Sequence, residues 1–334
     1  MSKSIVGKLV RYAVTTIIVV MLIFFARTIN WSDAWTSMRS ASLPLLAAAI
    51  LVNLLSLVAR GVRWWILLRA AGAPSLWLAL RATVAGAGLN NVLVANGGEA
   101  ARIVFITRAT NLSSSKVIAT AALDRLFDPI GFLVFLCFGV VAFHLPPSME
   151  RLRWPALGAL LVIVVLLFWL TMKARTVSPE HVPERRAVPR GWMGRVRAWL
   201  VEFGGSMRDL ATGPRVVAIV ALTIIAWAGQ LATFAFAAAA AHVPLSLPGN
   251  LAALLAVNVS LIVRATPGNV GFFQFAYTLA TEPFGVSKDA GVAVSLLIQT
   301  LQIIPVTLLG VALAPEFLLR KRAQVTPAPD LPVS

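Results

Sequence analysis

Charge is scarce in this sequence. Only 13% of its 334 residues are charged, whereas 59% are hydrophobic. Several apolar runs approach or exceed the roughly 20 residues that a helix needs to cross a bilayer. This composition excludes a soluble globular protein, and the absence of β-strand alternation argues against an outer-membrane barrel. We therefore predict an all-α polytopic membrane protein.

Cysteine and histidine are scarce as well. The single cysteine, Cys137, excludes a disulfide framework and a metal site built on thiolates. The three histidines, at positions 144, 181 and 242, are scattered without metal-ligand spacing. The G-x-x-x-x-G-K-[ST] motif that binds nucleotide phosphates is missing. We expect no metal and no other cofactor.

Acidic residues are outnumbered by basic ones. The chain has 29 Lys and Arg against 13 Asp and Glu, a formal net charge of +16. Most of the basic residues lie in short segments between apolar runs, as the positive-inside rule expects of cytoplasmic loops. We attribute the excess to membrane topology and to contact with anionic lipid headgroups, and we predict no nucleic-acid partner.

The order of apolar and basic segments predicts about six crossings, with both termini in the cytoplasm. The predicted spans are residues 12–29, 43–68, 117–143, 154–172, 215–241 and 291–313. Residues 1–322 are predicted to form one integral membrane domain, followed by a disordered tail at 323–334. The basic segment 173–213 is predicted to lie on the inner leaflet as an amphipathic helix, and a docking site for a cytoplasmic partner is the alternative.

Two further apolar stretches are too short to cross a bilayer. Residues 82–95 contain glycines and asparagines between basic flanks, which predicts a re-entrant hairpin from the cytoplasmic side. Residues 251–263 and 272–281 are separated by a Pro- and Gly-containing break, which predicts a second hairpin from the outer side. Paired broken segments point to the binding site of a transporter. The candidate binding residues in or beside these hairpins are Asn90, Glu99, Pro267, Gly268, Asn269, Gly271 and Gln274.

The span 117–143 carries three ionisable residues, Asp124, Arg125 and Asp128. Asp124 and Asp128 share one helix face, and Arg125 can neutralise one of them. Pro129 removes the helix hydrogen bond to the carbonyl of Arg125. Charges at membrane depth usually face a bundle interior or a watery cavity, which makes these residues binding candidates. Alternatively, since Asp124 lies only about 10 Å inside the span, the charges reach the headgroup level.

Two more groups of charges lie near the first hairpin. Arg60, Arg63 and Trp64 share one face of the second span, and such a face suits phosphate by charge and bidentate hydrogen bonding. The alternative is an ordinary border of Arg and Trp at the membrane surface. Glu99 and Arg102 are three residues apart at the start of the helix that follows the hairpin.

Four motifs therefore occur in order along the chain. They are Arg60-x-x-Arg63-Trp64, then Asn90 with Gly98-Glu99-x-x-Arg102, then Asp124-Arg125-x-x-Asp128, then Pro267-Gly268-x-x-Gly271-x-x-Gln274. Together they resemble the flippase-like membrane domain of lysylphosphatidylglycerol synthases and of stand-alone bacterial relatives, over nearly the whole chain. The resemblance implies a lipid translocator in a bacterial cell (inner) membrane, and not an enzyme.

The sequence departs from that family at several points. Val94-Ala95 stand where the family often has a proline, and Gln274 stands where it usually has a glutamate. The neutral amide removes a charge from a position that would otherwise couple to cations or protons. The soluble aminoacyl-transferase domain of the bifunctional members is absent from the chain, so we do not expect lipid aminoacylation.

Three functions are compatible with these patterns. In a lipid translocator for anionic or lipid-linked headgroups, the arginines would meet a phosphate, and the carboxylates would balance them or meet a cationic headgroup. In an intramembrane enzyme acting on a lipid phosphate, Glu99, Asp124 and Asp128 would serve as acid and base, although no nucleophile–histidine pair is visible. The third possibility is a noncatalytic membrane partner of a cytoplasmic synthase, docked through 173–213. We favour the translocator.

Overall fold

The computed structural model describes residues 31–72, 75–92, 97–110, 112–143, 213–261 and 269–319, with isolated residues at 27, 151 and between 154 and 165. Within these ranges the chain is helical, without strands. Four of the helices are long and apolar enough to cross a membrane. They are α3 (Leu43–Ala70), α6 (Ser114–Ala142), α10 (Gly213–Ala240) and α13 (Lys288–Leu319). The all-α polytopic class is therefore confirmed, and each of these helices coincides with most or all of a predicted span.

Other predictions lie outside the described residues. The span 12–29, most of the span 154–172, the basic segment 173–213 and the tail 323–334 belong there. So do Pro267 and Gly268 of the second break. The side of the membrane from which each hairpin enters, and the cytoplasmic location of both termini, stay predictions.

The chain divides into two compact units built from interleaved segments. The first unit comprises residues 1–57, 129–164 and 224–306. The second unit comprises residues 58–128, 165–223 and 307–334. Each of the four long helices contributes one part to each unit, because the boundaries fall within those helices.

The second unit is built around aromatic and aliphatic side chains of α3 and α5. Trp64, Leu67 and Leu68 of α3 pack with Phe105 and Ile106 of α5, and each of the five is at most 2% exposed. Burying side chains of this size is the main favourable contribution to the stability of such a unit. This packing fixes the faces of α3 and α5 that carry charged residues.

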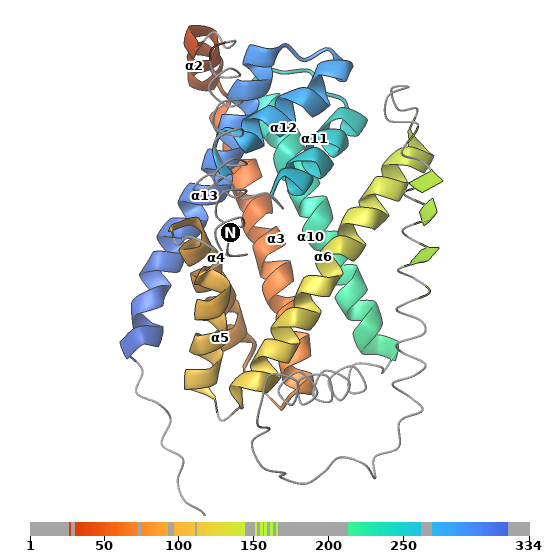
Figure 1. Ribbon diagram of the computed structural model, residues 1–334. Coiled ribbons are helices and arrows are strands. Elements are labelled where there is room, and N and C mark those ends of the chain that lie inside the picture. Colours follow the sequence, from red (N-terminus) through yellow and green to blue (C-terminus); the bar gives the residue numbers. More distant parts are fainter. Residues whose placement is uncertain are drawn as a thin grey trace, which may run out of the picture. The chain divides into compact units, whose positions relative to one another are not determined.

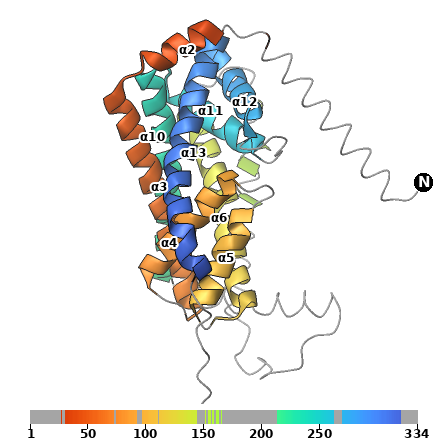
Figure 2. The same cartoon turned by 90° about the vertical axis from the view of Figure 1, so that its left-hand side faces the viewer.

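The first hairpin belongs to this second unit. Its arms, α4 (Leu76–Val92) and α5 (Gly97–Ala109), lie side by side (Figures 1 and 2). The prediction of a whole hairpin within residues 82–95 is wrong, because residues 82–92 belong to a single helix that begins at Leu76. The hairpin is formed instead by this helix and the helix that follows it, α5. The helix continues through Arg81. The guanidinium of Arg81 lies 5.9 Å from the Trp77 ring centroid, where the ring face attracts a cation.

The arms of this hairpin touch through backbone. A Cβ atom built on Gly98 would lie 1.9 Å from the carbonyl oxygen of Gly86, so no larger residue fits at position 98 without displacing α4. The Gly98 N–H donates to Asn90 Oδ1 at 2.9 Å, which ties the end of α4 to the start of α5. This contact holds α5 at a fixed height beside α4.

The first unit contains the second hairpin, α11 (Leu247–Ser260) and α12 (Phe272–Thr281). The Ser246 hydroxyl accepts the Gly249 N–H at 3.4 Å, and Pro248 occupies the first turn, where a missing N–H is tolerated. These residues start α11 four positions before the predicted 251. The bounds of α12 agree with the predicted 272–281.

Helix α10 packs against this hairpin. Phe273 and Tyr277 of α12 meet Phe234 of α10, with ring centroids 6.3 and 6.0 Å apart. The short helix α2 (Trp31–Arg39) precedes α3, and η3 (Glu282–Phe284) follows α12 directly. The aromatic contacts fix the face of α12 that carries Gln274.

Candidate functional site

Six charged side chains of the second unit close a ring of alternating sign. Each cation is ion-paired with two anions, and each anion with two cations. In order around the ring they are Arg63, Asp124, Arg102, Glu99, Arg125 and Asp128. They come from α3, α5 and α6, so three elements meet at the ring. The ring carries no net charge, since three guanidiniums face three carboxylates.

Arg63 occupies the most enclosed position, with its side chain 1% exposed. Its Nε donates to Asp124 Oδ1 at 2.8 Å, and its Nη2 donates to Asp128 Oδ1 at 2.9 Å. The same Nη2 reaches the backbone carbonyl of Asp124 at 3.2 Å, and Nη1 donates to Thr223 Oγ1 at 3.2 Å. A buried cation of this kind is tolerated because its donors are used.

Arg102 completes the buried side of the ring. Its Nη2 donates to Asp124 Oδ2 at 3.3 Å. Its Nε lies 3.0 Å from Glu99 Oε2, but the N–H is not aligned for a hydrogen bond, so this contact is an ion pair only. The guanidinium carbon also lies 4.4 Å from the Trp64 ring centroid, where the ring face attracts a cation.

The other side of the ring is accessible. The Arg125 side chain is 50% exposed, and Glu99 and Asp128 are 23% and 24% exposed. Arg125 donates to Asp128 Oδ2 at 3.2 Å and to Glu99 Oε1. The ring therefore has an enclosed floor, made by Arg63, Asp124 and Arg102, and a reachable rim, made by Glu99, Arg125 and Asp128.

The floor of the ring does not lie at the membrane surface, as the two alternative interpretations of these residues required. Arg63, Trp64 and Asp124 are at most 3% exposed, so they are neither a surface border nor charges that reach out to the headgroups. Arg125 pairs with Asp128 and not with Asp124, which pairs across the unit with Arg63 and Arg102.

Arg60 lies one turn before Arg63 on α3 and beside the ring. Among the described residues it makes no ion pair, although Asp128 and Asp124 attract it at longer range. Asn90, by contrast, is used within the hairpin, since its Oδ1 accepts the Gly98 N–H. The described residues contain no group of three His, Cys, Asp or Glu side chains arranged to hold a metal ion.

Three of the predicted residues of the second hairpin, Asn269, Gly271 and Gln274, lie in the first unit in a neutral cluster. Gln274 Oε1 accepts the Gly271 N–H at 2.6 Å, and its Nε2 donates to Gln299 Oε1 at 2.7 Å. Asn269, at φ 58°, donates to Ser260 Oγ at 3.2 Å. Gly271, at φ 88°, has a backbone conformation that L side chains rarely adopt. These hydrogen bonds connect residues 269–271, which precede α12, to both α11 and α13.

The four motifs predict membership of one family, and a comparison with family models tests this prediction. The family model of the lysylphosphatidylglycerol synthase TM region matches residues 9–310. This chain belongs to that family. It is also similar to a UPF0104 membrane protein of Pyrococcus horikoshii, at 24% identity, over 82% of this chain and 87% of the relative.

Membership in the lysylphosphatidylglycerol synthase TM family confirms a multi-pass membrane protein. Several polar contacts at its two clusters come from residues that sequence reasoning missed. They are Thr223 at Arg63, Ser260 at Asn269 and Gln299 at Gln274. Gln299 had a signal, because an amide inside the apolar span 291–313 needs a polar partner. Thr223 and Ser260 had none, since small hydroxyls in helices usually bond to the preceding turn.

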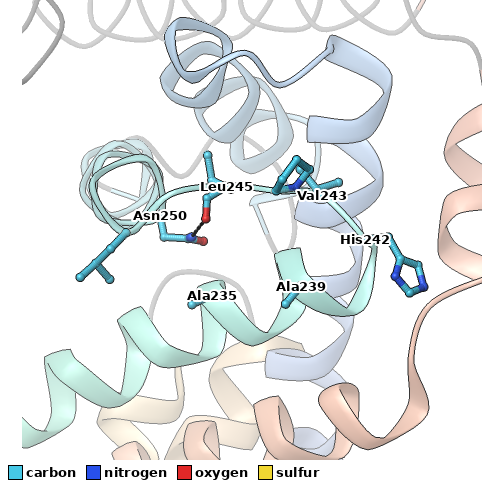
Figure 3. Close-up of a pocket in the computed structure, with 8 residues that line it drawn as sticks. Ala235, Ala239, His242, Val243, Leu245 and Asn250 are labelled. Carbon is cyan, nitrogen blue, oxygen red and sulfur yellow. Dashed lines mark hydrogen bonds between the residues drawn. The ribbon is translucent and has the colours of Figure 1, made fainter.

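This family member also has a pocket that none of the predicted residues lines (Figure 3). It has a volume of about 470 Å³ in the first unit and lies between the end of α10 and the segment from His242 to Asn250. Asn250 Nδ2 donates to the carbonyls of Leu245 and Ser246 at 3.0 and 3.1 Å, which holds that segment. The pocket contains no charged pair, and we therefore place the candidate site at the ring.

Proposed function

We propose that this protein is a lipid translocator, which moves a phospholipid or a lipid-linked headgroup between leaflets of a bacterial cell membrane without acting as an enzyme. The observation that carries the proposal is the closed ring of three guanidiniums and three carboxylates. A headgroup that enters a bilayer loses its hydration, and this loss must be offset by polar groups of the protein. The ring offers both signs of charge.

The neutrality of the ring favours transport over permanent binding. In the absence of a ligand its charges satisfy one another, so the site is stable when empty. Its rim residues Glu99, Arg125 and Asp128 are partly exposed and can exchange partners with a headgroup. Its floor residues stay enclosed and keep the helices together. A translocator needs this combination, because the headgroup must leave as readily as it arrives.

A groove beside the rim is suited to the rest of a lipid. It has a volume of about 690 Å³ and is lined by α5 and the start of α6. Ile103 lies one turn after Glu99, and Ile118 lies two turns before Arg125, so the groove continues the faces that carry this ion pair. Val104 and Ile118 are 41% and 43% exposed in it. The lining also includes Thr107, Arg108 and Ser114, so only the part made by Ile103, Val104 and Ile118 suits an acyl chain.

Translocation in liposomes tests the proposal. The protein is reconstituted with lipids that carry a fluorescent headgroup or chain label, and a membrane-impermeant quencher reports exchange between leaflets. We expect the wild type to accelerate exchange over empty liposomes, and Arg125→Gln to slow it by about tenfold or more, because a charge-assisted contact is lost.

Arg69→Gln is the matched control. Arg69 ends the same helix as Arg63, is exposed, and lies over the Trp65 ring at 5.3 Å, away from the ring of ion pairs. It should exchange lipid at the wild-type rate. Exchange no faster than in empty liposomes, for anionic, zwitterionic and cationic lipids alike, would refute the proposal.

A further inference from the structure

Arg60 gives the site a positive excess. The ring is neutral, and Arg60 raises the cluster to four guanidiniums against three carboxylates, a net charge of +1. Arg60 and Arg63 are three residues apart on α3 and therefore share a helix face. Every ring arginine has two carboxylate partners, whereas among the described residues Arg60 has none within ion-pair distance.

The excess is concentrated around Asp128. Three guanidiniums attract this carboxylate, those of Arg60, Arg63 and Arg125. Oδ1 already accepts from Arg63 at 2.9 Å, and Oδ2 accepts from Arg125 at 3.2 Å. Each oxygen is thus already engaged by another guanidinium. Arg60 lies one turn before Arg63, and Arg63 and Arg125 both donate to Asp128, so a second anion beside Asp128 would lie close to Arg60 as well as to Arg125.

The same two cations are the ones that a ligand can reach. The Arg125 side chain is 50% exposed and Arg60 is only partly buried, whereas the side chains of Arg63 and Arg102 are 1% and 6% exposed. A guanidinium within an apolar span is costly without an anion beside it. Its planar fork matches the oxygens of a phosphate.

We infer that Arg60 and Arg125 together bind the phosphate of a lipid whose headgroup is net negative. This inference rests on the proposed function and names its substrate class. The floor of the ring holds its own charges and does not take part in recognition. A zwitterionic headgroup carries a cation together with its phosphate and therefore gains less from a cluster of net charge +1 than a net negative headgroup does, and a cationic headgroup would add to the excess. Electrostatics therefore selects an anionic lipid.

Lipid binding by the delipidated protein tests this inference. Short-chain phosphatidylglycerol and phosphatidylcholine are titrated into the full-length protein in detergent, and bound lipid is counted by native mass spectrometry. We expect the wild type to prefer phosphatidylglycerol by about tenfold or more, as expected for a charge-assisted contact. Arg60→Gln should lose this preference, and Arg69→Gln should keep it.

Two further experiments complete the test. One distinguishes a change in headgroup recognition from unfolding of the protein, and the other distinguishes a lipid ligand from a soluble anion. Asp128→Asn raises the cluster to +2 and should strengthen phosphatidylglycerol binding, a gain that unfolding cannot mimic. Inorganic phosphate at the same concentration should displace little lipid. Effective displacement would reassign the site to a soluble anion and overturn the lipid assignment.

The outcomes also separate this inference from the proposed function. Loss of preference in Arg69→Gln equal to that in Arg60→Gln, or a wild-type preference for a zwitterionic or cationic lipid, would overturn the inference. Lipid exchange that continues while Arg60→Gln keeps its headgroup preference would remove the inference and leave the translocator standing. Arg60-dependent binding without lipid exchange would keep the anion site and refute translocation.

Discussion

The two hairpins bury polar groups in different ways. The hairpin α4–α5 borders a ring of six charges, whereas the hairpin α11–α12 holds neutral amides such as Gln274 and Asn269, each 4% exposed. Removing one partner of a buried ion pair costs about 3–5 kcal/mol, and removing a neutral hydrogen-bond partner costs about 1–3 kcal/mol. The floor of the ring should therefore lose more stability than the amide cluster when one residue is replaced, although the two are buried to a similar extent.

The largest expected effect is at the centre of the ring. Arg63→Met removes the cation that both Asp124 and Asp128 share while nearly keeping its volume. We expect the free energy of unfolding to fall by about 3–5 kcal/mol, because two carboxylates lose a partner in an enclosed site. Denaturant unfolding of the detergent-solubilised protein measures the change.

A double variant sharpens this test. Adding Asp124→Leu to Arg63→Met removes one charge of each sign and restores the +1 of the wild-type cluster. It should recover part of the lost stability, since an apolar pair can replace a buried ion pair. Arg69→Met, on the exposed end of the same helix, should change the unfolding free energy by less than about 0.5 kcal/mol. Equal losses at positions 63 and 69 would show that the ring does not stabilise the fold.

The intermediate effect is in the amide cluster. Gln274→Leu deletes the hydrogen bonds to the Gly271 N–H and to Gln299, which should cost about 1–3 kcal/mol. Gln274→Glu keeps an acceptor for Gly271, and Gln299 can turn its amide to donate, so the loss should be smaller. Thermal unfolding ranks the two variants. A Glu variant less stable than the Leu variant would mean that a charge cannot be buried there.

The smallest effect on stability is expected at the rim. Glu99 is 23% exposed, and partly solvated ion pairs contribute about 0–1 kcal/mol. Glu99→Gln should therefore unfold within about 1 kcal/mol of the wild type, yet change the rate of lipid exchange, because it frees Arg125. A loss as large as that of Arg63→Met would mean that rim and floor are not distinct.

Sequence reasoning located the charged residues of the ring and expected Arg125 to neutralise one of the two aspartates, which its pair with Asp128 confirms, but it did not find the pairs between helices. Arginines and carboxylates inside apolar segments signal a site by their cost alone. The bond between Arg63 and Asp124 joins residues 61 positions apart, and it depends on how α3 and α6 pack. No local pattern encodes that packing.

The hairpins were predictable for a different reason. Glycines and short apolar runs mark a break locally, and the second hairpin is the predicted pair of helices. The first differs, since residues 82–92 lie in one helix and the hairpin is made by α4 and the following helix α5. The starts of α4 and α11 were placed too late, at residues 82 and 251 instead of Leu76 and Leu247. Arg81 lies inside α4 with its guanidinium over the Trp77 ring, and Pro248 lies in the first turn of α11, where a missing N–H is tolerated. Asn90, predicted to bind a ligand, instead accepts the Gly98 N–H, a bond that only the folded hairpin reveals.

The glycines of α4 have a mechanical consequence. Gly86 meets α5 at Gly98, and Gly88, about 200° further around α4, meets α13 at Gly310, where an added Cβ would lie 2.6 Å from the Gly88 Cα. Asn91 also bonds Thr307 of α13 at 3.0 Å. Contacts between bare backbones leave no side-chain layer to deform. A displacement of α4 must therefore move α5 and the last part of α13 by the same amount, so that the three segments move as one rigid body. Glu99 and Arg102, which lie on α5, move with them.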